Sequence, residues 1–539
     1  MSGQANASVA GGTGAWPSPP ARTPWLGLLA VLLGAFISTL TGRLSTFGLA
    51  DIRGALHVGF DEGAWITTAQ TVAQMLIAPA AVWMGRVWGP RRVLMMAASA
   101  FAVISTLLPL APNLPTFLAL QYCAGLASGC FIPLTLGFIL MNVPQKVWAW
   151  GVAIYALNLE LSLNISASLE GWYVDHLTWR CIFWQNVPLA LGMAACLRFG
   201  VPADAPNPSP PPIDRYGLIT AGLGLSLIYA ALDQGNRLDW LNSGLVWALL
   251  LPGGVLLTAF FVHEARTARP LLDLKVVFAS PLPQLLLLIA FLRLTVLSTA
   301  FLIPQYLQAV RGFRALEVGQ TLVWIAAPQL ILCPLGALML RRLDPRMVAS
   351  IGFVLISLAC LSVAHGLTPL WGSDQFLPSQ LMQAAGQTLA LSGVQFFATL
   401  HLRPQDGLTF GAMLQTARLM GGEVGQAFVV TLDRVRAQVA SNLIGSHVQT
   451  GSTLVVQRLH DYSAATARAG DSGDGQSRAA IVLGSVVRSL AATQGVIDAF
   501  VVVAALTAVA LMLVVSNRPA PVGPASHVPL FIRRGTTTP

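Results

Sequence analysis

Long apolar runs separated by short polar segments dominate this sequence from residue 25 to residue 516. A helix crosses a bilayer with about 20 mostly apolar residues, and fourteen runs of that kind can be placed. They lie near residues 25–49, 64–84, 93–111, 116–141, 149–171, 182–201, 217–233, 243–263, 283–307, 318–340, 348–366, 377–400, 408–431 and 496–516. The pattern predicts an all-α membrane protein with fourteen spans, whose even number puts both termini on one side of the membrane.

The composition makes lipid the solvent for most of the surface of the chain. Charged residues are 10% of the chain and hydrophobic residues 55%, whereas soluble domains carry about 25% charged residues. The net charge of +9 indicates topology rather than nucleic-acid binding. Lys and Arg are concentrated in the segments on the side of the termini, which the positive-inside rule identifies as the cytoplasm.

The spans divide the chain into two six-helix bundles joined by a central segment. Residues 1–24 are predicted to be a disordered cytoplasmic tail, 25–201 the first bundle, and 202–280 a Pro-rich linker that carries two extra spans. Residues 281–516 are predicted to form the second bundle, including a long periplasmic loop at 432–495, and 517–539 a second cytoplasmic tail. Within the loop, residues 479–492 have the apolar spacing of a helix.

Ionisable residues inside the predicted spans are the first candidates for function. Six of them are selected, three of each sign: Arg43, Glu160, Glu170, Arg293, Arg418 and Glu423. A charge at the centre of a bilayer costs roughly 2.5–3.5 kcal/mol, so these side chains must pair or line a wet cavity. Arg43 and Glu170 lie toward the ends of their spans. Each either pairs or lines the cavity, or it extends to the membrane interface. Glu423 follows Arg418 by five residues and is either its structural partner or a functional acid.

The fifth span has an unusual polar pattern, because residues 157–170 alternate strictly between apolar and polar side chains. Alternation normally indicates a strand, but a lone strand leaves its backbone unpaired in lipid, so we expect a helix. Such a helix must be buried or border a cavity, with Asn158 and Asn164 as cavity candidates. On the twelfth span, Gln383 and Gln387 share one face and either line the same cavity or join helices by hydrogen bonds.

Four motifs, in order along nearly the whole chain, carry a resemblance to a known family. Residues 179–188 read Trp-Arg-Cys-Ile-Phe-Trp-Gln-Asn-Val-Pro, 270–274 Pro-Leu-Leu-Asp-Leu, 304–308 Pro-Gln-Tyr-Leu-Gln, and 418–425 Arg-x-x-Gly-Gly-x-x-Gly. The chain resembles the EmrB/QacA-type drug:proton antiporters, the fourteen-span branch of the major facilitator superfamily. The loop at 85–92 also resembles the cytoplasmic gating loop of that superfamily, through Gly89, Arg91 and Arg92.

The resemblance implies a major facilitator fold of two six-helix bundles plus two extra central spans. It further implies alternating-access export of amphiphilic or aromatic small molecules, driven by protons, across a bacterial inner membrane. Membrane lipids are expected partners and, in double-membrane bacteria, so are a periplasmic membrane-fusion adaptor and an outer-membrane channel. Gln121 lies where relatives carry an arginine in span four, and is a further candidate for the substrate cavity.

The sequence departs from the family at positions tied to proton coupling. Span one reads Leu-Thr-Gly-Arg at 40–43, without the acid that relatives carry, and residues 166–171 lack the Gly-Pro-x-x-Gly-Gly motif of span five. We therefore predict that the coupling acid has moved to span five, with Glu160 as first choice and Glu170 as second. Glu423 is the remaining acid within the spans. Burial favours the protonated form of a carboxylic acid, which a proton carrier needs near neutral pH.

Two other functions stay open at this point. The three arginines in the spans favour export of organic anions with atypical coupling, and the missing coupling residues favour a membrane receptor or assembly scaffold that does not transport. An enzyme, a cofactor and a metal are not expected, since no metal-ligand cluster and no nucleophile–base arrangement stands out in the sequence. ATP-driven transport is not expected either, because no P-loop motif appears.

Overall fold

The structure, a computed structural model, describes residues 24–142, 148–203, 213–267, 271, 282–401, 407–449, 451–468 and 475–517. All the regular elements in these ranges are helices. Apart from Pro24 and Asn517, the two predicted tails lie outside the described residues, and so does most of the motif at 270–274. Each of the fourteen predicted spans coincides with a helix or a pair of consecutive helices.

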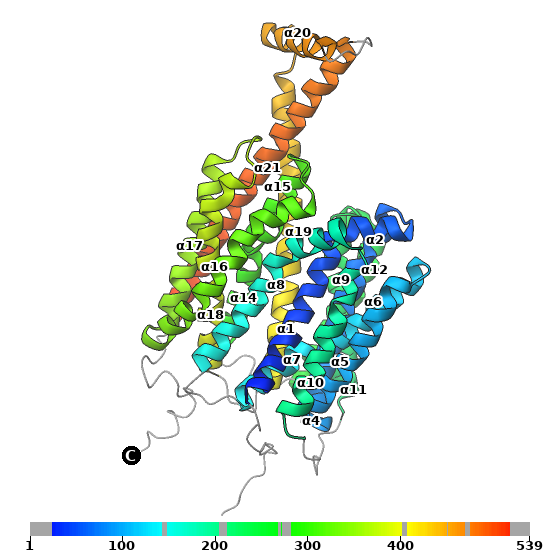
Figure 1. Cartoon of the computed structure of the whole chain (residues 1–539), viewed down its shortest axis with the longest axis vertical. Helices are drawn as coiled ribbons and strands as arrows, with labels where there is room; N and C mark the ends of the chain where they lie inside the picture. Colours follow the sequence, from blue (N-terminus) through cyan, green and yellow to red (C-terminus); the bar gives the residue numbers. More distant parts are fainter. Residues whose placement is uncertain are drawn as a thin grey trace, which may run out of the picture.

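The first half of the chain forms one bundle (Figure 1). Short helices α2 (Leu49–Leu56) and α3 (Phe60–Gly63) follow the first long helix, and α9 (Cys181–Trp184) precedes the last. The long helices are α1 (Pro24–Phe47), α4 (Trp65–Trp88), α5 (Pro90–Leu107), α6 (Leu114–Gly129), α7 (Phe131–Asn142), α8 (Trp148–His176) and α10 (Asn186–Gly200). Helix α1 packs against α7, α8 and α10, which places it at the centre of this half.

The second half forms another bundle, beside the first in Figure 1. A π-helical turn, Ser298–Leu302, joins its first two helices. The helices are α14 (Leu282–Thr295), α15 (Ile303–Ala309), α16 (Ala315–Arg342), α17 (Pro345–Gly366), α18 (Leu377–Thr399), α19 (Gly407–Ser446), α20 (Thr453–Arg468) and α21 (Gly475–Ser516). Helix α1 begins and α21 ends at the lower end of the bundles in Figure 1, which we call the termini end.

Two helices between the halves, α11 (Arg215–Gly235) and α12 (Gly244–Arg266), pack against each other. They differ in their surroundings. Helix α11 contacts α4 of the first half and α19 of the second, so it lies at the junction of the halves. Only 17% of the apolar stretch of α12 is buried, and Leu251 and Val255 are exposed. In a membrane protein such a surface faces lipid, so α12 is peripheral whereas α11 can contribute to a central site.

Ten helical segments among the described residues are long and apolar enough to cross a membrane. Some of these segments, such as Leu282–Ala309, combine consecutive helices. The other four predicted spans correspond to α4, α10, α18 and α19, which are helical but shorter or more polar; α10, for example, has 15 residues. The count of fourteen spans stays a prediction.

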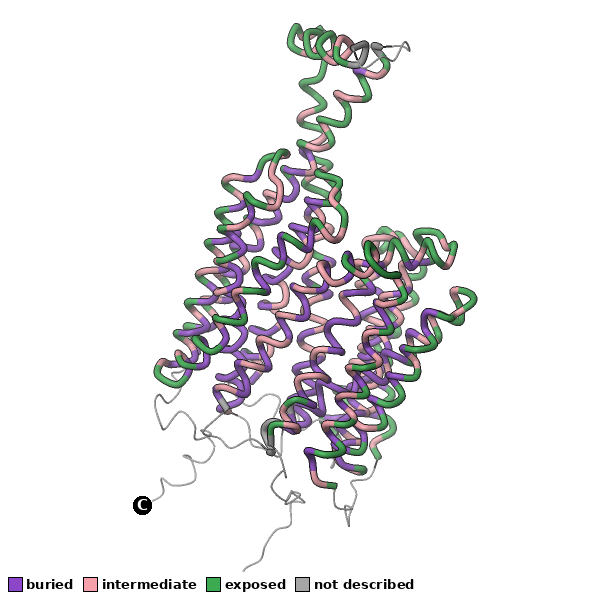
Figure 2. Tube along the Cα trace, viewed as in Figure 1, coloured by how far each residue is buried: buried purple, intermediate pink, exposed green. Residues whose placement is uncertain are grey.

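The segment at 432–495, predicted to be a long periplasmic loop, is largely helical in its described part. Helix α19 continues to Ser446, α20 follows, and α21 starts at Gly475. These segments project beyond the bundles and are mostly exposed (Figures 1 and 2). Hydropathy detects where lipid ends, but a helix satisfies its own backbone and can continue into water. The expectation of a helix at 479–492 is confirmed, since these residues belong to α21.

Close contact between the halves occurs at the end opposite the termini, between α8 and α16. A Cβ atom added at Gly171 of α8 would lie 2.5 Å from the backbone nitrogen of Leu316. One added at Gly319 of α16 would lie 2.5 Å from the Cα atom of Ser168. Real Cβ atoms do not approach so closely, so glycine at both positions lets the two backbones meet.

Candidate functional site

A cavity of about 180 Å³ lies between the halves. Helices α1, α4, α8, α11, α14 and α19 all contribute to its wall. Five charged residues line it: Arg43, Asp233, Arg293, Arg418 and Glu423. Three of the predicted cavity residues, the arginines, are therefore brought together from three different helices.

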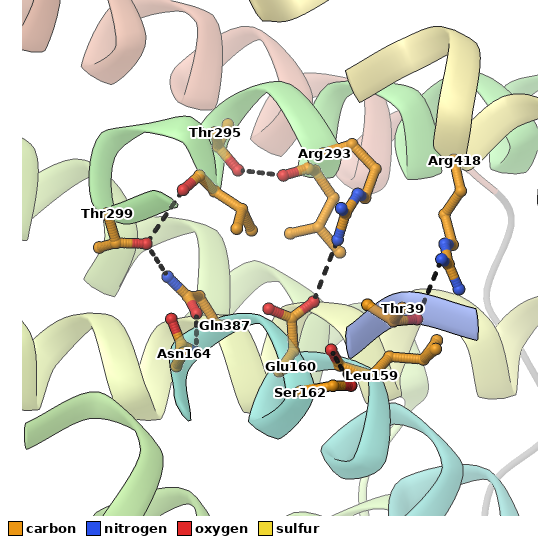
Figure 3. Close-up of polar contacts among 12 residues, drawn as sticks. Thr39, Leu159, Glu160, Ser162, Asn164, Arg293, Thr295, Thr299, Gln387 and Arg418 are labelled. Atoms are coloured by element: carbon orange, nitrogen blue, oxygen red, sulfur yellow. Dashed lines mark hydrogen bonds and ion pairs between the residues drawn. The ribbon is translucent and has the colours of Figure 1, made fainter. Parts of the chain in front are cut away.

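Arg418 of α19 is the most buried of these arginines, at 4% exposure. Its Nη2 atom donates a 3.3 Å hydrogen bond to the Thr39 hydroxyl of α1, in the other half (Figure 3). Its Nε and Nη1 atoms have no hydrogen-bond partner. An unpaired buried donor of a charged group is expensive. Arg418 therefore offers two donors to an acceptor that enters the cavity.

Arg43 of α1 lies at the cavity and does not extend to the membrane interface. Its Nη2 atom donates a 2.6 Å hydrogen bond to the carbonyl oxygen of Ala300, and its guanidinium lies 5.2 Å from the centre of the Phe47 ring. Ala300 belongs to the π-helical turn, a distortion that is frequent at functional sites. The Nε atom of Arg43 has no partner. The bond to Ala300 also joins the two halves.

Glu160 of α8 lies against Arg293 of α14. The Glu160 Oε1 atom is 3.8 Å from Arg293 Nη1, and the side chain of Glu160 is 2% exposed (Figure 3). This distance makes an ion pair but not a hydrogen bond, and neither carboxylate oxygen has a hydrogen-bond partner. Glu160 is not part of the cavity wall, since Arg293 lines the cavity instead. Arg418 is the other positive charge that acts on this carboxylate.

Glu423 and Asp233 form an acidic part of the cavity wall. Tyr229 of α11 lies beside Glu423 of α19. Asp233, one turn after Tyr229, accepts hydrogen bonds from the Thr68 hydroxyl and from Gln234 Nε2, the latter at 3.1 Å. Glu423 therefore does not rely on Arg418, and no described ion pair joins the two. Residues five apart on a helix point in different directions, which explains why that expected partnership does not form.

Sequence reasoning did not single out Tyr229 and Asp233. Asp233 is the last residue of the seventh predicted span, which places it at a span boundary in the sequence. The spacing of an aromatic hydroxyl and a carboxylate at i and i+4 was the available signal. What the sequence did not indicate is that α11 lies between the halves.

The predicted residues Asn164, Gln383 and Gln387 do not line the cavity, but they are buried in one polar network. Asn164 Nδ2 donates to Gln387 Oε1 at 3.4 Å, and equally to Gln329 Oε1 of α16. Gln387 Nε2 donates to the Thr299 hydroxyl at 3.0 Å, and Gln383 Nε2 to the Ser298 hydroxyl at 3.0 Å. The network joins α8, α16, α18 and the π-helical turn, which is the second of the two roles considered for the glutamines (Figure 3).

Three further candidates are buried or half-buried within the first half, outside the cavity wall. Gln121 donates to Gln70 Oε1 at 3.0 Å, and Asn158 donates to the carbonyl oxygen of Leu32 at 2.7 Å. Glu170 is 1% exposed and its Oε2 atom has no partner. Protein covers Glu170, and Asp51 of α2 is a negative charge beside it. Burial, with the charge of Asp175 as a smaller cause, raises the pKa of Asp51.

The gating-loop residues lie at the termini end, between α4 and α5. Gly89 has φ of 88°, a value that favours glycine. Arg91 is buried and donates to the carbonyl oxygens of Leu197 and Arg198, each at 3.1 Å, at the end of α10 in the same half. Arg92 is exposed.

Arg86, near the end of α4, reaches the other half. Its Nη2 atom donates a 2.6 Å hydrogen bond to the Thr409 hydroxyl of α19. The two halves therefore meet at both ends. At the termini end α7 packs closely against α19, where a Cβ atom added at Gly411 would clash with the carbonyl oxygen of Pro133, and Arg86 adds a polar contact. At the other end α8 packs against α16.

Comparisons with known proteins agree with this architecture. The family model described as Major Facilitator Superfamily matches residues 31–425. The chain is 24% identical over 429 residues to the multidrug export protein EmrB of Haemophilus influenzae, covering 78% of this chain and 82% of that protein. It is 22% identical over 469 residues to the fatty acid resistance protein FarB of Neisseria gonorrhoeae, covering 86% of this chain and 90% of that one.

A solved structure has the same fold. The human organic anion transporter MFSD10 aligns with a TM-score of 0.53 at 15% sequence identity. The alignment covers 91% of this chain and 97% of that chain. At this identity the match carries the fold and nothing about cargo.

Proposed function

The chain belongs to the major facilitator superfamily, and we propose that it is a proton-driven exporter of amphiphilic or aromatic small molecules in a bacterial inner membrane. The observation that carries the proposal is the cavity, whose charged wall is built from both halves and from α11. A central site between two bundles that move against each other is how secondary transporters expose cargo to each side in turn. The names of relatives such as the EmrB multidrug export protein support the cargo class.

Alternating access requires contacts between the halves that can break and re-form. Three hydrogen bonds fit this requirement, since each joins one side chain to a single acceptor: Arg86 to Thr409, Arg43 to Ala300, and Arg418 to Thr39. A net hydrogen bond is worth about 0.5–1.5 kcal/mol, which a bound cargo molecule can offset. We place the termini end, and with it the Arg86 contact, in the cytoplasm.

Proton coupling is assigned to Glu160, for the reason that its ion pair joins α8 to α14. Protonation would remove the negative charge and with it the attraction to Arg293, so the pair would weaken when a proton binds. Arg293 would then be free to contact cargo in the cavity. Glu170 and Glu423 remain the alternative acids, because each is also buried within a span.

A second candidate function is export of organic anions, and the unpaired donors of Arg418 and Arg43 favour it. The relative named for fatty acid resistance is in line with this cargo. The third function considered, a scaffold that does not transport, has no specific observation in its favour. For either exporter, the projection made by α19, α20 and α21 is the proposed docking surface for a periplasmic adaptor protein, which would lead to an outer-membrane channel.

The test is transport by the purified protein in proteoliposomes with an imposed pH gradient. A fluorescent aromatic cation and an aromatic carboxylate of similar size serve as cargo, each with and without an uncoupler. Uncoupler-sensitive accumulation of the cation supports the first function, and preference for the carboxylate supports the second. Absence of gradient-dependent movement of both would leave the scaffold as the better description.

A further inference from the structure

The charges around the cavity are separated by sign. Arg43 and Arg418 both lie close enough to Arg293 for their positive charges to repel it. Asp233 and Glu423 likewise lie close enough to repel each other. Helix α19 carries one member of each group, Arg418 and Glu423, and five residues of helix separate them by about 7.5 Å along its axis.

The basic part of the wall has more charge than its own partner can neutralise. Glu160 lies against Arg293 and is the acid that pairs there. Arg43 and Arg418 instead have neutral oxygen atoms as their recorded partners, Ala300 and Thr39. Arg418 lines the cavity and is only 4% exposed, and two of its nitrogen atoms have no hydrogen-bond partner. This side chain independently points to an anionic group as its missing partner.

The acidic part has neutral partners too. The Tyr229 hydroxyl lies beside Glu423, and Thr68 and Gln234 donate hydrogen bonds to Asp233. Arg237 acts on Asp233 from outside the cavity, but its own 2.8 Å ion pair is with Asp61. Two carboxylates thus face the cavity, and no described ion pair joins either of them to an arginine of the cavity wall. This is an arrangement that can receive an ammonium group.

The formal charges of the whole set add up to zero, because Glu160, Asp233 and Glu423 offset the three arginines. A cargo molecule with a single charge would leave one part of the wall unmatched and the cavity with a net charge. Net charge in a low-dielectric site is costly. A molecule with one charge of each sign would match both parts and leave the total at zero.

We propose that the cavity selects zwitterionic small molecules, with the anionic group against Arg43 and Arg418 and the cationic group against Asp233 and Glu423. The inference rests on the proposed export function and narrows its cargo. A cavity of about 180 Å³ suits a single aromatic ring with a charged group at each end. The inserted helix α11 supplies one of the two acids, Asp233, and places Tyr229 beside the other.

Binding to the purified full-length protein tests this directly, without a gradient or a transport cycle. The probes are 4-(2-aminoethyl)benzoate, its methyl ester and 4-ethylbenzoate, which share one ring and are zwitterionic, cationic and anionic at pH 7. Calorimetric titration gives the Kd of each. The zwitterion should bind at least about tenfold more tightly than either singly charged probe, since each matched charge adds a charge-assisted hydrogen bond.

Variants assign the two ends of the cavity. Arg418→Gln should reduce the affinity for the zwitterion to that for the methyl ester and leave binding of the ester unchanged. Glu423→Gln should reduce the affinity for the zwitterion to the affinity for 4-ethylbenzoate, and it should leave the binding of 4-ethylbenzoate unchanged. Arg458→Gln, an exposed change on α20, is the matched control and should alter none of the three values.

Equal Kd values for the three probes in the unaltered protein would overturn the proposal, as would tighter binding of a singly charged probe or binding of none. These measurements do not depend on either variant folding. They are also separate from the export function. Selective binding without gradient-driven accumulation would keep this inference and reject the exporter, whereas accumulation of aromatic cations without zwitterion preference would do the reverse.

Discussion

Glu160 lies 3.8 Å from Arg293, and the pair joins the first half of the molecule to the second. Glu160 is buried and Arg293 is 16% exposed at the cavity, so water screens the pair less than it would a surface pair. Breaking such a pair by removing one charge leaves the other uncompensated. This makes the pair sensitive to the protonation of Glu160, and that sensitivity leads to the first prediction.

Glu160→Gln should leave the protein folded and abolish proton-driven accumulation of cargo. The neutral isostere imitates the protonated acid, so the pair with Arg293 stays weakened at every pH. Exchange of cargo down its own gradient should survive, and the pH dependence of transport between pH 5 and 8 should disappear. Proteoliposome uptake at a series of pH values measures both.

Glu170→Gln is the matched control for that change, because Glu170 is also a buried acid of α8 but has no described ion pair. It should keep the pH dependence of the unaltered protein. If Glu160→Gln still accumulates cargo with unchanged pH dependence, Glu160 is not the coupling acid and Glu170 becomes the next to test.

Thr409→Val should favour opening at the termini end. The change removes the hydroxyl that accepts the 2.6 Å hydrogen bond from Arg86. A loss of about 1 kcal/mol would raise the open population roughly fivefold. The readout is the labelling rate of a cysteine introduced at Ser38, a cavity residue, in a background without the native cysteines.

Thr258→Val controls for the loss of a hydroxyl. Thr258 lies on the lipid-facing helix α12 and bonds to Gly254 within its own helix, at 2.8 Å. Its replacement should leave the labelling rate at Ser38 unchanged. An equal rate in both variants would mean that the Arg86 contact does not hold the halves together.

Gly319→Ala should destabilise the contact of α8 with α16. The added Cβ would lie 2.5 Å from the Cα atom of Ser168, a backbone atom that cannot move by itself. We expect a loss of about 1–3 kcal/mol, the usual cost of overpacking, seen as a lower Tm of the purified protein. Gly254→Ala has no atom within 4 Å of the new Cβ and should be neutral or slightly stabilising.

Cysteines introduced at Ser209 and Ser452 should be labelled from opposite sides of the membrane. Ser209 lies in the Pro-rich linker, outside the described residues, and Ser452 lies between α19 and α20 in the projection. Impermeant maleimide applied to intact spheroplasts should reach Ser452 and not Ser209. Labelling of both from one side would contradict the fourteen-span topology.

The sequence predicts the burial of the fifth span well. Glu160, Asn164 and Glu170 are each 1% exposed, as the argument from alternating polarity and backbone pairing in lipid requires. The same argument cannot say which neighbour a polar side chain meets. Gln387 shares a face with Gln383 as expected, but that face meets α8 and the π-helical turn rather than the cavity.

Two features escape sequence reasoning because they depend on packing between distant segments. Asp233 enters the site only because α11 lies between α4 and α19, a placement that hydropathy does not encode. The continuation of α19 past its predicted end is invisible for another reason. Apolar content reports contact with lipid, whereas helix formation in water depends on the backbone and on partner helices such as α21.

Helix α19 runs without interruption from the cavity into the projection, so it is a mechanical connection between cargo and the far end of the molecule. From Glu423 to Ser446 the helix is about 35 Å long. A tilt of only about 10° at the cavity would displace that end by about 6 Å, a simple consequence of its length at 1.5 Å per residue. A protein bound at α20 would therefore be moved each time the halves change their relative orientation. It would respond to cargo in the cavity without contacting that cargo.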